Sequence, residues 1–304
     1  FRITQNTING KYKMKFFIAI LPTLFFFSCI DVGPLQLDND KSTFVSEIIS
    51  DTVFTEGIEG PAMNSKGDLF VVNFQRQGTI GVLERNSSKF QLYVDLPKGS
   101  VGNGIRLDDK DNMYIADYTN HNILFIENGT KNVQIYCTNK AVNQPNDLVL
   151  HKSGFGFASD PNWKNKTGNL LRFSKGKLEI IENNMGTTNG IELSPNGDKL
   201  YVNESLQNII WQYDVDSLGN LSNKNVFIQF HDYGMDGMRC DKRGNVYLAR
   251  YGKGVITVLD KTGKLLEEIP LHGKKPTNIT FPKGTNKEAY VTIQDKKWVE
   301  KIIF

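Results

Sequence analysis

Cysteine is scarce in this sequence. Three cysteines occur among 304 residues, and none has the close spacing of a metal-binding or redox motif. Apart from Cys29, only Cys137 and Cys240 remain, and we expect both to be unpaired thiols inside the fold. The fold must therefore be held together by packing rather than by disulfides or cysteine-bound zinc.

A large charge of one sign is also missing, as is a long apolar run. The formal net charge is only +3 and no dense block of lysine and arginine occurs, which argues against binding to nucleic acid or to a membrane surface through basic residues. The apolar run at residues 16–27 is shorter than the about 20 residues of a membrane-spanning helix. We expect a monomer whose partner is a small molecule.

The N-terminal segment differs from the rest of the chain. Met14 and Lys15 precede the apolar run, which ends at Ser28-Cys29 and is similar to the signal peptide of a bacterial lipoprotein. We expect residues 1–13 to be an upstream extension, 14–28 the signal peptide and 29–41 a tether, with a lipid on Cys29. The protein would then lie in the cell envelope. A plain secretory signal and a buried strand are the alternatives.

One pattern recurs six times at intervals of 42 to 47 residues. In each copy an acidic or amide residue, usually followed by Gly or Asp, precedes a short apolar strand, a polar turn and a second strand. The leading residues are Glu59, Asn103, Asn146, Asn189, Asp236 and Asn278.

A repeat of this length is typical of a propeller blade. Each copy holds short runs rich in Val, Ile, Tyr and Phe, bounded by Gly, Asn or Asp, and about four such strands fit one copy. No stretch has a convincing helical period. The sequence therefore predicts an all-β, six-bladed β-propeller over residues 42–304. The segment 44–50 could pair with the last strand near residues 298–304 and close the ring.

The leading residues are expected to meet at the propeller axis. The first strand of each blade lines the central channel, so a residue at the same phase in every repeat points at the same place. The alternative is that Asn-Gly and Asp-Gly form hairpin turns, which is their usual role. Each copy already has a separate turn a few residues later, such as Lys66-Gly67-Asp68, which favours the axial position.

Carboxylates and amide oxygens that converge without water repel one another unless a cation or protons compensate them. Such hard oxygen ligands favour Ca²⁺, Mg²⁺ or Mn²⁺. We expect one divalent cation, with calcium the first choice because mixed oxygen donors suit its loose geometry. Zinc is possible but lacks its usual His or Cys ligands here.

Four segments of the chain resemble the family of gluconolactonase, senescence-marker protein and luciferin-regenerating enzyme. They are residues 54–61 around Glu59, residues 144–147 with 158–161, residues 188–197 around Asn189, and residues 235–239 around Asp236. The similarity covers roughly residues 50 to 300 on the six-repeat background.

The resemblance implies a divalent-metal lactonase or a related esterase that acts on a sugar lactone such as an aldonolactone. By position, Glu59, Asn189 and Asp236 resemble metal ligands, and Asn146 a residue that touches both metal and substrate. Asn103 would be a channel or substrate contact. Asn278 would be structural, and Glu56 competes with Glu59.

The chain departs from its animal relatives at two substrate positions. Gln144 stands where they have an arginine, and an acidic residue is missing near Lys164. The identity of the lactone is therefore open. The segment 161–168, with an exposed Trp163, could be a lid that sets selectivity.

The chemistry that we expect is cation-assisted hydrolysis. The cation would polarise the ester carbonyl, and Asp236 would be the catalytic general base. No Gly-x-Ser-x-Gly elbow occurs and no histidine occupies a leading position, so a serine-hydrolase mechanism has little support. A phosphotriesterase-type hydrolase and a non-enzymatic binding propeller are the main alternatives. A strictosidine-synthase-like activity has the least support.

Overall fold

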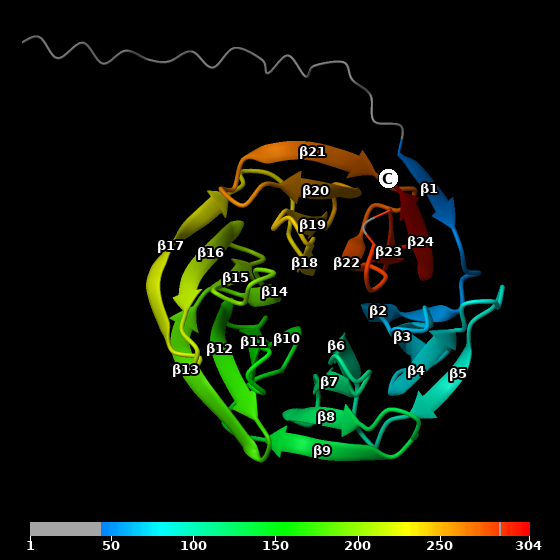
Figure 1. The fold of residues 1–304 in the computed structure, drawn as a ribbon, viewed down its shortest axis with the longest axis horizontal. Coiled ribbons are helices and arrows are strands. Elements are labelled where there is room, and N and C mark those ends of the chain that lie inside the picture. The colour runs from blue at the N-terminus through cyan, green and yellow to red at the C-terminus, as the bar shows by residue number, and fades with distance from the viewer. Residues whose placement is uncertain (1–43, 286) are drawn as a thin grey trace, which may run out of the picture. The chain divides into compact units, whose positions relative to one another are not determined.

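The structure is a computed structural model that describes residues 44–285 and 287–304. In this part of the chain, six four-stranded antiparallel sheets are arranged around one axis, which confirms the six-bladed β-propeller (Figure 1). The predictions for residues 1–13, 14–28 and 29–41, including Cys29, fall outside the described residues.

The strands follow the order expected from the repeats, with four consecutive strands in each of the first five blades. Blades 1 to 3 consist of β2 (Phe54–Met63), β3 (Leu69–Phe74), β4 (Thr79–Leu83) and β5 (Gln91–Asp95); β6 (Gly102–Leu107), β7 (Met113–Asp117), β8 (Asn122–Ile126) and β9 (Val133–Thr138); and β10 (Leu148–Leu150), β11 (Gly156–Asn162), β12 (Thr167–Ser174) and β13 (Lys177–Met185). Blades 4 and 5 consist of β14 (Thr188–Leu193), β15 (Lys199–Glu204), β16 (Ile209–Val215) and β17 (Leu221–Gln229); and β18 (Met238–Cys240), β19 (Val246–Arg250), β20 (Val255–Leu259) and β21 (Leu265–Pro270).

The sixth blade joins the two ends of the described chain. It contains β22 (Pro276–Thr280), β23 (Glu288–Ile293) and β24 (Trp298–Ile303), and its outer strand is β1 (Val45–Ile48). β1 pairs antiparallel with β24, with Val45 opposite Ile303 and Ile48 opposite Glu300. The predicted pairing of residues 44–50 with the last strand is confirmed, and it closes the ring without a disulfide.

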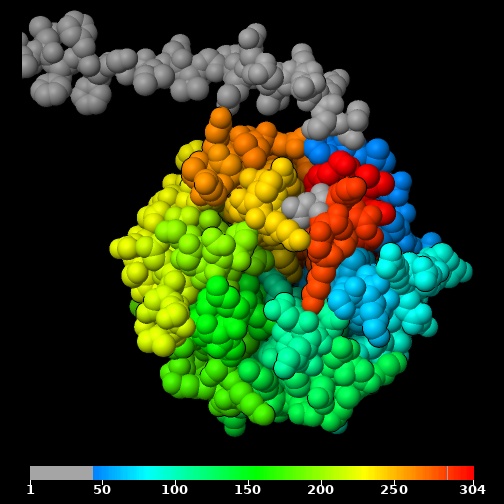
Figure 2. All heavy atoms as spheres, in the orientation of Figure 1, coloured from blue at the N-terminus to red at the C-terminus, as the bar shows by residue number. Residues whose placement is uncertain are grey.

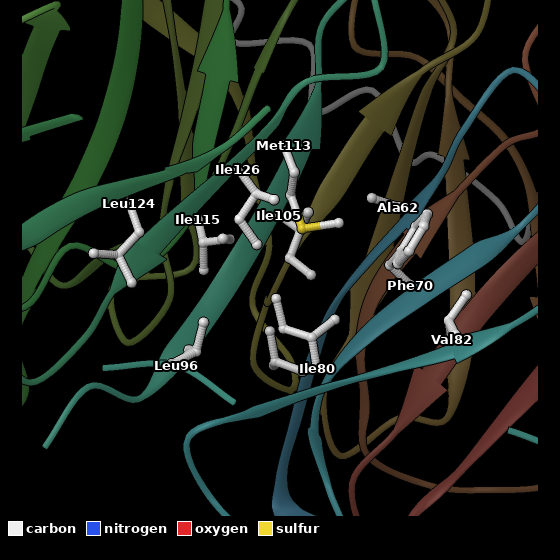
Figure 3. Close-up of a cluster of buried hydrophobic side chains, with 11 residues drawn as sticks. Ala62, Phe70, Ile80, Val82, Leu96, Ile105, Met113, Ile115, Leu124 and Ile126 are labelled. Carbon is white, nitrogen blue, oxygen red and sulfur yellow. The ribbon is translucent and has the colours of Figure 1, made fainter. Parts of the chain in front are cut away.

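The core lies between neighbouring blades. Every residue of β3 is buried, whereas no residue of the outermost strand β5 is fully buried. Between blades 1 and 2, side chains such as Phe70, Ile80, Ile105 and Leu124 pack face to face (Figure 3). A strand that is buried on both faces, such as β3, therefore reads as a nearly continuous apolar run.

The two cysteines of the described ranges form no disulfide. Cys137 and Cys240 are both free; Cys137 is buried and Cys240 is partly buried. Among the described residues no helix is long and apolar enough to cross a membrane.

Candidate active site

A cavity of about 500 Å³ lies at the hub on one face of the ring. Five of the six predicted leading residues line it: Glu59, Asn103, Asn146, Asn189 and Asp236. Turns that join the second and third strands of the blades form its mouth. A second cavity of about 860 Å³ is lined by the turns between first and second strands, and the hub is visibly hollowed in the view along the axis (Figure 2).

The leading residues are not hairpin turns. Glu59, Asn103 and Asn189 lie within first strands, and Asn146 and Asp236 lie two residues before the start of theirs. The glycines that follow most of the leading residues do not form turns. They allow the first strands of neighbouring blades to approach one another closely. A Cβ atom on Gly60, whose φ is +58°, would lie 2.0 Å from the carbonyl oxygen of Asn103 in the next blade.

The leading position of the sixth repeat lies one residue earlier than the repeat pattern predicts. The Gly104 amide donates to the Asn146 carbonyl at 2.8 Å, and the Gly237 amide donates in the same way to the Thr277 carbonyl at 2.6 Å. Thr277, which lines the cavity, therefore holds the leading position in blade 6. Asn278 takes the place of the glycine in other copies, and the prediction that it is a leading residue is wrong.

Asn146 and Asn189 present amide oxygens that have no partner. Both side chains are buried, and neither Oδ1 atom accepts a hydrogen bond within the described part of the protein. A buried amide oxygen without a donor costs about 1–3 kcal/mol. Because both residues line the cavity, these oxygens are placed to bind a ligand that supplies positive charge.

The partly buried carboxyl group of Asp236 lies beside the buried carboxyl group of Glu59. Burial, with the nearby charge of Asp147, raises the pKa of Glu59 to about 7. Burial and the charge of Glu59 raise the pKa of Asp236 well above its usual value, although Asp236 accepts a hydrogen bond from Asn189. Two adjacent carboxyls cannot both ionise cheaply in this setting, so a proton or a cation must accompany them.

Asn103 lies in the wall of the cavity, whereas Glu56 lies at its exposed edge. Asn103 lines the cavity and donates through Nδ2 to the Asn146 carbonyl at 3.2 Å. The Glu56 side chain is 83% exposed and pairs with Lys297 at 3.5 Å. Its place at the rim favours Glu59 as the carboxylate at the hub.

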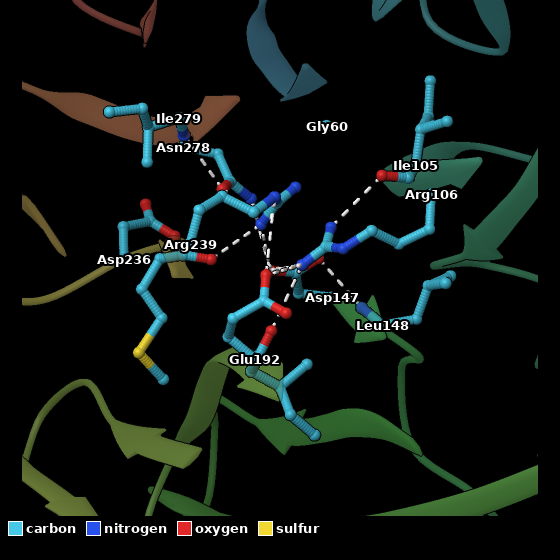
Figure 4. A network of polar contacts seen from close by, with 12 residues as sticks. Gly60, Ile105, Arg106, Asp147, Leu148, Glu192, Asp236, Arg239, Asn278 and Ile279 are labelled. Carbon is cyan, nitrogen blue, oxygen red and sulfur yellow. Dashed lines mark hydrogen bonds and ion pairs between the residues drawn. The ribbon is translucent and has the colours of Figure 1, made fainter. Parts of the chain in front are cut away.

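A network of charged side chains lies beside the leading residues in the channel. Arg106 from β6 and Arg239 from β18 reach toward Asp147 and Glu192 from opposite sides (Figure 4). Arg106 Nη1 lies 2.8 Å from Asp147 Oδ1, and Arg239 Nη1 lies 3.5 Å from Asp147 Oδ2. Glu192 lies 3.6 Å from Arg106 and 3.8 Å from Arg239.

Asn278 links this network to Glu59. Its Nδ2 donates to Glu59 Oε2 at 3.1 Å and to Asp147 Oδ2 at 3.3 Å, while its Oδ1 accepts from Arg239 at 3.0 Å. The Gly60 amide also donates to the Glu59 carboxylate. Asn278 therefore holds the Glu59 carboxylate in place.

The charges of the hub fit a divalent cation. Three buried carboxylates belong to Glu59, Asp147 and Glu192, a fourth and partly buried one belongs to Asp236, and two buried guanidinium groups belong to Arg106 and Arg239. Although burial raises it, the two guanidiniums hold the pKa of Asp147 below its usual range. If all six groups are ionised, two negative charges remain in excess, and they lie on the side of Glu59 and Asp236.

The donor set is also of the right kind for such a cation. Within the described ranges, no three His, Cys, Asp or Glu side chains are placed to hold a metal ion together. The predicted cradle instead combines two carboxylates with two unpartnered amide oxygens, as hard cations accept. Glu59, Asn146, Asn189 and Asp236 together are called the cradle below.

Two buried side chains that the repeat pattern did not reveal hold the cradle loops. Asp160 is fully buried and accepts the Asn143 and Gln144 amides at 3.0 and 2.6 Å, which fixes the segment before Asn146. Arg250 is fully buried and donates to the Asp232 and Gly234 carbonyls at 2.7 and 3.4 Å, which fixes the segment before Asp236.

The predicted lid is a hairpin turn. Residues 161–168 connect β11 to β12, and Trp163 in this turn lines the cavity and is only partly exposed. Tyr118 hydrogen-bonds with the side chains of Gln144 and Trp163. Lys164 is exposed, and none of the four histidines lines this cavity.

The SMP-30/Gluconolactonase/LRE-like family matches residues 58–295 of the chain, which include the whole cradle. The chain belongs to this family. The six-bladed ring and the shared cavity of the cradle residues agree with the assignment.

Two curated relatives of this family member span most of its length. A gluconolactonase of Zymomonas mobilis is 27% identical over 251 residues, which cover 70% of this chain and 69% of that protein. A diisopropyl-fluorophosphatase of Loligo vulgaris is 23% identical over 280 residues, which cover 81% of this chain and 88% of that protein.

A solved structure supports the fold of this family member. Regucalcin of Agrobacterium tumefaciens, described as a calcium-binding protein, superposes with a TM-score of 0.74 at 21% identity. The superposition covers 86% of this chain and 93% of that protein. At this identity the likeness establishes the fold alone.

Proposed function

We propose that this protein is a hydrolase that opens lactones with the help of one divalent cation held in the cradle. The observation that carries the proposal is the pair of buried, unpartnered amide oxygens on Asn146 and Asn189 beside the carboxyls of Glu59 and Asp236. Membership in a family that contains gluconolactonases supports the lactone as substrate.

A bound cation, calcium in the first instance, would supply a Lewis acid that polarises the ester carbonyl and stabilises the oxyanion. The chain provides the rest of the chemistry. Asn278 and the Gly60 amide hold the Glu59 carboxylate in place, and Asn103 can orient the lactone ring from the cavity wall. The charged network under the cavity keeps the buried charges paired.

Asp236 is the general base in this proposal. Its carboxylate takes a proton from the water that attacks the carbonyl carbon and returns it to the ring oxygen as the acyl–oxygen bond breaks, which yields the hydroxy acid. Burial and the charge of Glu59 raise the pKa of Asp236, which makes its carboxylate a stronger proton acceptor than an ordinary aspartate. The hydrogen bond from Asn189 fixes the position of the carboxyl group.

The test of the proposed function is a hydrolysis assay with and without chelator. We expect the purified full-length chain to acidify a pH indicator in the presence of lactones, including aldonolactones, to lose this activity with chelator, and to regain it with Ca²⁺. Mg²⁺, Mn²⁺ and Zn²⁺ are compared in parallel. Activity that survives complete removal of divalent cations would contradict the role of the cradle.

Diisopropyl fluorophosphate serves as the alternative substrate, because the Loligo relative is a diisopropyl-fluorophosphatase. Release of fluoride without hydrolysis of any lactone would favour a phosphotriesterase-type enzyme that uses the same cradle. Binding of the cation without hydrolysis of either class would favour a non-enzymatic binding propeller.

The setting of the enzyme is part of the proposal. We propose a monomer that acts on a small molecule and reaches the cell envelope through a lipid on Cys29, which rests on the sequence pattern of residues 14–28 alone.

A further inference from the structure

Apart from the cation proposed for the cradle, the cavity wall offers a substrate no positively charged side chain. Among the described residues that line it, none is a lysine, arginine or histidine, whereas Glu56, Glu59 and Asp236 contribute carboxyl groups. Lys275 contacts Tyr251 and Lys297 contacts Glu56, both of which line the cavity, but neither lysine lines it. A substrate with a phosphate, sulfonate or carboxylate would therefore meet only like charges from the side chains of the wall.

The mouth of the cavity is apolar over four neighbouring blades. Tyr118 of blade 2, Trp163 of blade 3, Leu206 of blade 4 and Tyr251 of blade 5 line it, and each lies in or next to the turn between the second and third strands. We call these four residues the apolar rim. Leu206 is 51% exposed on its turn, so a ligand in the cavity can bury much of its side chain.

Several polar groups of the same wall already have partners. The Tyr251 hydroxyl bonds to Gln294, and the Tyr118 hydroxyl interacts with Gln144 and Trp163. Thr119 Oγ1 donates to the Gly99 carbonyl at 2.6 Å. These groups have little capacity left for the several hydroxyls of a sugar lactone, each of which needs a partner when it is buried.

We infer that the preferred substrate is an uncharged lactone with an alkyl arm, whose ester lies on the cradle and whose arm lies along the apolar rim. This inference rests on the proposed lactonase function and narrows its substrate class. The cavity volume of about 500 Å³ is within the range of about 300–1,000 Å³ found for ligand pockets, which leaves room for a ring and an arm.

The test compares lactones that share one ring. δ-Valerolactone has no arm and δ-nonalactone has a four-carbon arm. Since each buried methylene contributes about 0.8 kcal/mol, or roughly fourfold, we expect kcat/KM to be at least about tenfold higher for δ-nonalactone even if the arm is half buried. We also expect δ-nonalactone to exceed glucono-δ-lactone, and 6-phosphogluconolactone to be the poorest substrate.

The variant Leu206→Asn tests whether the rim is responsible. It should lower the δ-nonalactone to δ-valerolactone ratio of kcat/KM at least about threefold, because a polar amide replaces the apolar contact. Leu218→Asn is the matched control, since Leu218 is 67% exposed and does not line the cavity, and it should leave the ratio unchanged.

The outcomes separate the two proposals. A ratio near one, or a preference for glucono-δ-lactone or for 6-phosphogluconolactone, overturns the substrate class and leaves the lactonase function standing. A high ratio that Leu206→Asn does not change overturns the assignment to the rim. If no lactone is hydrolysed, the proposed function itself fails, and the inference fails with it.

Discussion

Replacement of Asp236 by Asn is expected to abolish lactone hydrolysis while the fold is preserved. The amide keeps the size of the side chain but removes the proposed general base and one negative charge of the cradle. Because a positioned base alone contributes about 10²–10⁴-fold, we expect kcat/KM to fall by about 10³-fold or more. The measurement is initial-rate kinetics with the pH indicator, together with a circular dichroism melt.

The control for this variant is Asp214→Asn. Asp214 lies on the surface, where it pairs with Lys199, and its loss should leave kcat/KM unchanged. If Asp236→Asn hydrolyses lactones as fast as the wild type, Asp236 is neither the base nor an essential ligand, and the proposed mechanism is wrong.

Replacement of Asp147 by Ala is expected to produce the largest loss of stability. Asp147 is buried between the guanidinium groups of Arg106 and Arg239, and it also accepts from Asn278. Removal of one partner from a buried ion pair costs about 3–5 kcal/mol because a charge stays behind unpaired. For a domain of this size, the melting temperature should fall by roughly 10 °C.

The exposed pair of Arg76 and Asp95 provides the control, because both side chains are more than half exposed. Asp95→Ala should change the free energy of unfolding by less than about 1 kcal/mol. Urea denaturation of both variants measures the difference. A loss below about 1 kcal/mol for Asp147→Ala would show that the network does not depend on this carboxylate.

The repeats predicted the architecture well for a physical reason. Every blade must bury the same faces, so the sequence repeats its strands and turns, and even the closing pair of β1 and β24 could be anticipated. The register of the sixth copy could not be read as well. In this copy Thr277 and Asn278 replace the usual pair of a polar residue and a glycine. The leading position is therefore shifted by one residue, which becomes evident only in the structure, where Ile279 is buried in the core.

The sequence analysis did not predict the charged network, although the repeat contains a pattern that indicates it. Arg106, Glu192 and Arg239 each stand three residues after a leading residue, so they share one phase of the repeat. The phase indicates that they face the channel, but it does not show which of them meet. Those contacts depend on the distances across the ring, such as the 2.8 Å between Arg106 and Asp147.

The cradle residues were predicted in part from the repeat and in part from the family resemblance. The structure places all four around one cavity, and it adds the orphaned oxygens of Asn146 and Asn189, which no sequence pattern reveals. The apolar rim could not be predicted, because its residues come from four turns that have no common motif. Of these four residues, the sequence indicated a role only for Trp163, as part of a possible lid.

Calorimetric titration of the chelator-stripped protein with Ca²⁺ tests most directly whether the cradle binds one divalent cation. We expect one site per chain at pH 8 and a much weaker or undetectable site in Glu59→Gln. Because the pKa of Glu59 is raised to about 7, a proton competes with the cation at lower pH. Affinity should therefore fall by up to about tenfold per pH unit for each competing proton below pH 7. Absence of binding at pH 8, or equal affinity in Glu59→Gln, would contradict the account.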